Sequence, residues 1–409
     1  FRDVAALIDP TTVTFKSITH PTDTTVLEQN YYFDLVNQQK LLERFLDQTI
    51  TAEQYRGEQV ESFEGKLLSA AGGLVLENNN GRVTALNHYD NIRFPELPGG
   101  LITKPTLVWD VATESPGKHT IESSYQTDGI TWWADYNAVY SEGKNENSGF
   151  LDLGAWVSIV NKSGASYNDA KLKLIAGDVH RATPARPPVM RKEMMMAMAA
   201  DSSGSGFQEK SFFEFHLYTL GRAATIPDNS TKQIELFPQA TGIPVTKEYL
   251  YDGAQQPDKV GVYLKFRNEK EQGLGIALPA GRLRVSKRDD ADNSLEFIGE
   301  DIIDHTPKDE DIRVKLGNAF DIVGERKQTY NRTENARRWA EEKYEIVVRN
   351  HKDAPIDVTI KEHLYRSSNW KISDYTGSYE KQDSNTIHFP VHVPANGEET
   401  VQYTVRYTW

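Results

Sequence analysis

The chain of 409 residues has 46 Lys and Arg residues and 59 Asp and Glu residues, which give a formal net charge of −13, and it has no cysteine. Such a charge repels phosphate backbones, and no local run of Lys or Arg offsets it, so we expect no nucleic-acid partner. The lack of cysteine excludes disulfides, thiolate metal sites and cysteine nucleophiles. The sequence has no apolar run as long as the roughly 18 residues of a membrane span, so it predicts no transmembrane segment.

The first 97 residues combine strands with one helix. Residues 1–34 alternate apolar and polar side chains in the manner of strands, and we expect these strands to belong to a central sandwich. Residues 35–46 then place apolar side chains at helical spacing. The short strands that follow, joined by turns rich in Gly and Asn, predict a small barrel over residues 35–97 that resembles SH3 and Sm modules. Because the chain begins at Phe1 within a strand-like pattern, we also expect a signal peptide to precede it.

From residue 98 onward the pattern predicts stacked antiparallel sheets. Strand signals recur about every 8 to 12 residues, as is typical of β-sandwiches, and predict a central sandwich over residues 98–330. Residues 182–210, rich in Met, Pro and Ser, interrupt this pattern and predict a flexible excursion from a sheet edge. Alternating strands over residues 331–409 predict an immunoglobulin-like sandwich. The predicted fold class is therefore all-β, with several antiparallel sandwiches and one small barrel preceded by a short helix.

Four segments of the chain stand out as motifs: Gly129–Tyr136 (GITWWADY), Val160–Gly164 (VNKSG), Ala170–Asp178 (AKLKLIAGD) and Ile226–Gln233 (IPDNSTKQ). Together with shorter segments at 27–31, 94–98, 298–300 and 403–409, they resemble the bacterial "domain of unknown function 4139" family over nearly the whole chain. Members of that family look like exported proteins of Gram-negative bacteria and have no assigned reaction. The resemblance therefore implies an exported protein, whether periplasmic, associated with the outer membrane or extracellular, and it implies no activity.

Two consecutive tryptophans mark the densest aromatic stretch of the chain. In a strand, Trp132 and Trp133 face opposite sides, and Asp135 shares a side with Trp133. One indole can then anchor a core while the other lies outside it, so a scaffold role explains the motif without any chemistry. The alternative is a binding site, for which the candidates are Trp132, Trp133, Asp135, Tyr136 and, at the border of the flexible excursion, His180.

The methionines are confined to one segment, since all five lie between positions 190 and 198. Clustered thioethers are soft ligands that suit Cu(I), which makes Met194, Met195, Met196 and Met198 candidates for a soft-metal site. The same side chains could form an adaptable apolar surface for a partner. The simplest interpretation is a low-complexity loop without a ligand.

An acidic turn near residue 290 offers oxygen ligands at alternate positions. Asp290, Asp292 and Glu296 could wrap a Ca²⁺ ion, but the segment lacks the glycine of an EF-hand loop. Asp and Asn also suit a hairpin turn, which is the simpler interpretation. His388 and His392 lie in a strand-like stretch, where their roughly 13 Å separation is too large to share one metal. The sequence predicts no cofactor.

These observations favour a non-enzymatic, exported structural or interaction protein of the Gram-negative envelope or cell surface. Exposed strand edges would let it bind a protein partner or a second copy of itself, and a polysaccharide or another envelope component is a further candidate partner. One alternative is an envelope hydrolase or carbohydrate-active enzyme, in which two carboxylates lie beside a sugar groove lined by Trp132, Trp133, Trp156 and Trp370. Another alternative is soft-metal binding through the methionine cluster.

Overall fold

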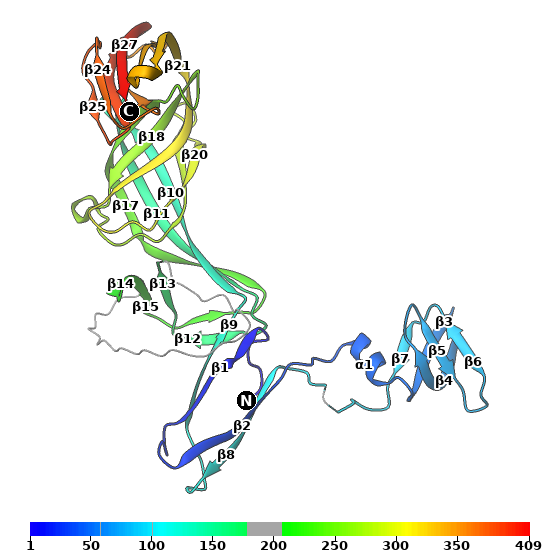
Figure 1. The fold of residues 1–409 in the computed structure, drawn as a ribbon. Helices are drawn as coiled ribbons and strands as arrows, with labels where there is room; N and C mark the ends of the chain where they lie inside the picture. The colour runs from blue at the N-terminus through cyan, green and yellow to red at the C-terminus, as the bar shows by residue number, and fades with distance from the viewer. Residues whose placement is uncertain (58, 100, 178–206) are drawn as a thin grey trace. The chain divides into compact units, whose positions relative to one another are not determined.

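The computed structural model describes residues 1–409 except for residues 58, 100 and 178–206 (Figure 1). Strands make up 63% of the chain and helices 3%, which confirms the all-β class with multiple antiparallel sheets. The immunoglobulin-like and SH3-like assignments stay predictions. Among the described residues, no helix has both the length and the apolar character that crossing a membrane requires.

The first of two compact units comprises residues 1–131, 160–168 and 225–230. Two antiparallel strand pairs form part of it: β1 (Ile8–Ser17) with β9 (Ile121–Thr127), and β2 (Thr24–Tyr32) with β8 (Thr106–Thr113). Val4 and Leu107 are fully buried here, and the side chain of Trp109 packs against them. The strands of residues 1–34 are thus held by strands that follow the helix in the chain.

The same unit contains a five-stranded sheet preceded by a helix. The helix α1 spans Gln38–Arg44, and the side chain of Asn37 caps it by accepting a hydrogen bond from the backbone amide of Lys40 at 3.0 Å. Leu42 and Phe45 pack into one core with buried side chains of the sheet, which fixes the helix against it. The sheet has the order β6–β5–β4–β3–β7, from β3 (Thr49–Arg56), β4 (Gln59–Ser69), β5 (Leu74–Glu77), β6 (Val83–Leu86) and β7 (Asn91–Arg93).

The second unit comprises residues 132–159, 169–224 and 231–409, and its main part is a run of seven neighbouring strands. Across the sheet these are β20 (Leu295–Ile303), β19 (Gly281–Arg288), β10 (Ile130–Glu142), β11 (Ser148–Asn161), β17 (Ser230–Tyr251), β18 (Lys259–Arg267) and β21 (Asp311–Glu334). The run curls, because β20 also lies beside β21, where the backbone amide of Lys315 donates to Asp301 Oδ2 at 2.7 Å. Strand β10 pairs with β19 in parallel, whereas β19 and β20 are antiparallel.

Short elements join these strands. A two-stranded sheet consists of β12 (Tyr167–Ala170) and β16 (Ala224–Ile226). A three-stranded antiparallel sheet has the order β13 (Lys173–Ala176), β15 (Phe215–Leu220) and β14 (Phe207–Phe212). Within the described ranges, single-turn 3₁₀ helices occur at Lys270–Gln272 and Asn335–Arg337.

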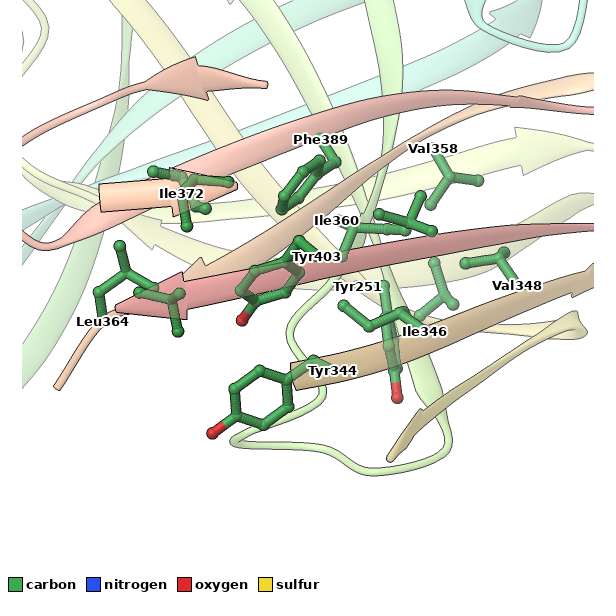
Figure 2. Packing of buried hydrophobic residues seen from close by; sticks show 14 of the residues in the cluster. Tyr251, Tyr344, Ile346, Val348, Val358, Ile360, Leu364, Ile372, Phe389 and Tyr403 are labelled. Atoms are coloured by element: carbon green, nitrogen blue, oxygen red, sulfur yellow. The ribbon is translucent and has the colours of Figure 1, made fainter. Parts of the chain in front are cut away.

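The last strands of the chain share one core, part of which Figure 2 shows. The sheet continues from β21 through β22 (Trp339–Asn350), β27 (Gly397–Thr408) and β24 (Trp370–Ser373), while β23 (Ile356–His363), β26 (Thr386–Val393) and β25 (Glu380–Lys381) pair with one another. Ile346 and Tyr403 from the first set pack in the same buried cluster as Ile360 and Phe389 from the second. Alternating apolar side chains on both sets therefore bury one shared face.

A buried glutamate on β22 is fully paired. Glu342 is 0% exposed, and its Oε1 accepts hydrogen bonds from Arg366 Nε at 2.6 Å and from the Tyr365 hydroxyl at 2.8 Å. Its Oε2 accepts one from the Tyr344 hydroxyl at 2.8 Å. Burial works to raise the pKa of Glu342, but these hydrogen bonds favour the charged form and hold the pKa below its ordinary value.

We expect Glu342 to make these strands sensitive to acid. Because its folded pKa lies below the ordinary 4.5, the carboxylate stabilises the fold above that pH, and this stabilisation is lost as the pH falls through the lowered pKa. Melting curves of the wild type and of Glu342→Gln between about pH 7 and about pH 3 measure the effect. The variant should melt at a lower temperature at neutral pH, and the difference should narrow in acid. Parallel pH profiles would contradict the assignment.

Candidate functional site

Strand β10 divides the predicted binding residues between its two faces. Tyr136 is fully buried on the inner face, where its hydroxyl donates to the backbone oxygen of Pro279 at 2.7 Å, and burial raises the pKa of Tyr136 well above its ordinary value. Trp132 lies on the same side of the strand and is half-buried. Trp133 and Asp135 lie on the outer face, so of these four residues only these two can take part in an outer-face surface.

On that outer face, two tryptophans lie on neighbouring strands. Trp133 of β10 is 42% exposed and Trp156 of β11 is 41% exposed. They line a concavity of about 790 Å³ together with polar side chains from three strands, and we call this surface the tryptophan face: Trp133, Asp135, Trp156, Ser158, Arg282 and Arg284. Large aromatic side chains left exposed beside polar groups mark a surface suited to binding.

Asp135 organises the tryptophan face. Its Oδ2 accepts hydrogen bonds from Trp133 Nε1 and from the Ser158 hydroxyl, both at 2.7 Å, and its Oδ1 accepts one from Arg284 Nη1 at 3.4 Å. Gln233 on β17 extends this network by donating to Ser158 Oγ at 3.0 Å. Asp135 is only 9% exposed, so its carboxylate serves to hold the Trp133 ring and the Arg284 guanidinium in place.

The two arginines of the tryptophan face share a second carboxylate. Glu300 on β20 lies 3.4 Å from Arg284 Nε and 3.8 Å from Arg282 Nη1, and all three side chains are partly exposed. Because a guanidinium carries five N–H donors, both arginines keep donors for a ligand. With this neighbouring Glu300 included, the two arginine charges balance the two carboxylate charges, so the cluster is neutral within a chain of net charge −13.

This arrangement is better suited to binding than to proton transfer. Asp135 already accepts three hydrogen bonds, and Glu300 contacts two guanidinium groups, so neither carboxylate is free to act on a substrate without first losing its partners. In the part of the chain that the structure describes, no group of three or more His, Asp or Glu side chains is placed to hold a metal ion.

Some of the other predicted site residues belong to segments that the structure does not describe, and others lie on other strands. His180 and the methionine cluster, Met194, Met195, Met196 and Met198, lie outside the described residues. Trp370 lies on β24, where its Nε1 donates to the backbone oxygen of Ser384 at 2.7 Å, so it takes no part in the tryptophan face. Of the four tryptophans proposed for a sugar groove, Trp133 and Trp156 are the two that the structure brings together.

The acidic residues near position 290 form the turn between β19 and β20. Asp292 Oδ1 accepts a hydrogen bond from the backbone amide of Ser294 at 2.9 Å, and Glu296 Oε1 accepts one from the Ser294 hydroxyl at 2.7 Å. These bonds hold the turn locally, and Asn293 adopts a left-handed backbone with φ 64°. Asp290 is exposed beside them, so the geometry is that of a hairpin turn held by local hydrogen bonds.

Hydrogen bonds join residues of two sequence motifs, Val160–Gly164 and Ile226–Gln233, in the first unit, and we call this set of contacts the Asn161 interlock. Asn161 is fully buried, and its Nδ2 lies within hydrogen-bond distance of the backbone oxygens of Ala165 (2.8 Å), Ile226 (3.2 Å) and Pro227 (3.0 Å). The backbone amide of Gly164 donates to Asp228 Oδ1 at 2.9 Å. A structural role therefore accounts for these motif residues.

Comparison with known proteins agrees with these motifs. Residues 121–409 match the family model described as Domain of unknown function (DUF4139), and the matched range contains every residue of the tryptophan face and of the Asn161 interlock. No curated protein and no solved structure matches the chain.

Proposed function

The chain belongs to the DUF4139 family, and we propose that it is a non-catalytic, exported interaction protein of the Gram-negative envelope. Because the description of the family assigns no activity, the proposal rests on the tryptophan face. The observation that carries this proposal is the pair of half-exposed indoles on neighbouring strands, with Asp135 committed to positioning. Tryptophan and arginine are the residues that most often anchor binding surfaces. The resemblance to exported proteins of Gram-negative bacteria supports the compartment.

The fixed geometry of the tryptophan face also favours recognition. The hydrogen bond from Trp133 Nε1 to Asp135 removes rotational freedom from an indole that stays 42% exposed. An aromatic side chain that is already held in place loses little conformational entropy when a ligand covers it. Strands β10, β11 and β19 supply the surface, so the backbone beneath it is held by ladder hydrogen bonds on both sides.

Sedimentation with washed envelope fragments of a Gram-negative bacterium tests this proposal. We expect the purified wild-type chain to pellet with the fragments, and the double variant Trp133→Ala, Trp156→Ala to bind at least about tenfold more weakly, since anchoring tryptophans each contribute more than about 1 kcal/mol. The matched control is Trp409→Ala, because Trp409 is 50% exposed and lies outside the tryptophan face. A wild-type chain that stays in the supernatant, or a double variant that pellets equally well, would contradict the proposal.

A further inference from the structure

We infer that the ligand of the tryptophan face is an uncharged, hydroxyl-rich glycan chain, an inference that rests on the proposed function and names its ligand class. The first argument is the pair of indole faces. Trp133 and Trp156 are each about two-fifths exposed on neighbouring strands, so each presents part of an aromatic ring to solvent. Sugar rings carry flat patches of C–H groups that pack on such rings, while their hydroxyls stay at the edge to form hydrogen bonds.

The second argument is the set of polar groups on the strands that flank the two rings. Sugar hydroxyls both donate and accept hydrogen bonds, so they require a surface that offers both. Arg282 and Arg284 supply planar N–H donors, and the partly exposed carboxylate of Glu300 supplies an acceptor beside them. At the margin, the exposed side chain of Gln233 adds its carbonyl oxygen as a further acceptor, while its Nε2 donates to Ser158 Oγ.

The third argument is charge. Arg282 and Arg284 balance Asp135 and Glu300, so the tryptophan face matches a neutral ligand better than an ionic one. A chain of net charge −13 also repels anionic polymers at long range. An uncharged glycan avoids this repulsion and still finds donors, acceptors and aromatic faces.

The size of the concavity favours a glycan over a protein partner. Its volume of about 790 Å³ lies within the range of sites that hold small ligands, and a few sugar rings would fill it. A protein partner would instead bury roughly 800 Å² on each side of a broader surface.

The test uses three preparations of the same washed envelope: untreated, digested with proteinase K, and stripped of glycan with periodate followed by lysozyme. Periodate cleaves vicinal diols, and lysozyme cuts peptidoglycan strands. We expect the wild-type chain to pellet equally with the untreated and the proteinase-digested material. Its affinity for the glycan-stripped material should be at least about tenfold lower, a factor that corresponds to about 1.4 kcal/mol.

The outcomes separate this inference from the proposed function. Loss of binding after proteinase K, or full binding after glycan removal, would overturn the glycan assignment while leaving the tryptophan face as a binding surface for another ligand. Absence of binding to the untreated envelope would remove the proposed function itself. Asp135→Asn provides a further readout, because it should loosen the Trp133 ring. Binding of this variant should be weakened by the same factor for the untreated and the proteinase-digested envelope.

Discussion

Replacement of Arg326 by Met should lower the free energy of unfolding of the C-terminal strands by about 3–5 kcal/mol. Arg326 Nε and Nη2 each donate to the carboxylate of Glu362 at 2.8 Å, and the Tyr403 hydroxyl also donates to it. Glu362 is 1% exposed, so the variant leaves a buried carboxylate without its counter-charge. Burial acts against the charge of Arg326, but its hydrogen bonds to Glu362 and the charge of that group raise the pKa of Arg326, so the guanidinium stays charged.

A matched control lies next to Arg326, between β21 and β22. Arg349 of β22 contacts Glu325 of β21 at 3.1 Å, but both side chains are at least partly exposed, so Arg349→Met should cost less than about 1 kcal/mol. The double variant Arg326→Met, Glu362→Met should be less destabilised than Arg326→Met alone, since no buried charge is left. Calorimetry that resolves the transitions of the two units measures all three variants, because a chain with two units need not unfold in one step. Equal effects of Arg326→Met and Arg349→Met would contradict the account.

Local patterns in the sequence predict well which segments form strands, but they predict poorly which distant strands pair with one another. Along β22 every second residue is buried and the residues between are half-buried or exposed, and this period of two is visible in the sequence itself. The parallel pairing of β10 with β19 has no such signal, because it joins positions nearly 150 residues apart, as in Asp135 beside Arg282. Strand β21 pairs with β18 at its start and β22 at its end, and nothing local marks a strand shared in this way.

The same difference explains what could be foreseen of the tryptophan face. Alternation predicts that Trp133 and Asp135 share a side of one strand, and it equally places Trp156 and Ser158 on one side of β11. Which sides face outward, and which residues lie across from them, depends on sheet order. Arg282 and Arg284 could not be found from the sequence for this reason, since they reach Asp135 only through the parallel pairing of β19 with β10.

One structural device recurs at three strand ends. Asn161 at the end of β11, Asn268 just after β18 and Asn350 at the end of β22 are all 0–1% exposed. Each amide nitrogen donates to two or more backbone oxygens that include one proline, and each side-chain oxygen accepts from a nearby backbone amide. An amide suits this position because it carries both donors and acceptors, so it can satisfy backbone groups where a strand ladder stops.

Replacement of Asn161 by Asp should therefore lower the free energy of unfolding of the first unit by about 3–5 kcal/mol, although the two side chains have nearly the same shape. The substitution turns the donor group of Asn161 into a carboxylate oxygen that faces the backbone oxygens of Ala165, Ile226 and Pro227, with no counter-charge among the contacts of this side chain. Oδ1 keeps its hydrogen bonds from the amide and hydroxyl of Ser163, but the new oxygen meets only acceptors, so it loses its hydration without a hydrogen bond in return.

The control for this variant is Asn80→Asp in the same unit. The side chain of Asn80 is exposed in the turn between β5 and β6, so the same change of chemistry should shift stability by less than about 0.5 kcal/mol. Calorimetry of the first unit's transition, with hydrogen exchange of the backbone amides near residues 161–165, compares the two variants. If Asn161→Asp proves as mild as Asn80→Asp, the amide is not what holds these segments together. The recurrence at Asn268 and Asn350 would then lack a structural reason as well, because both rest on the same donor geometry.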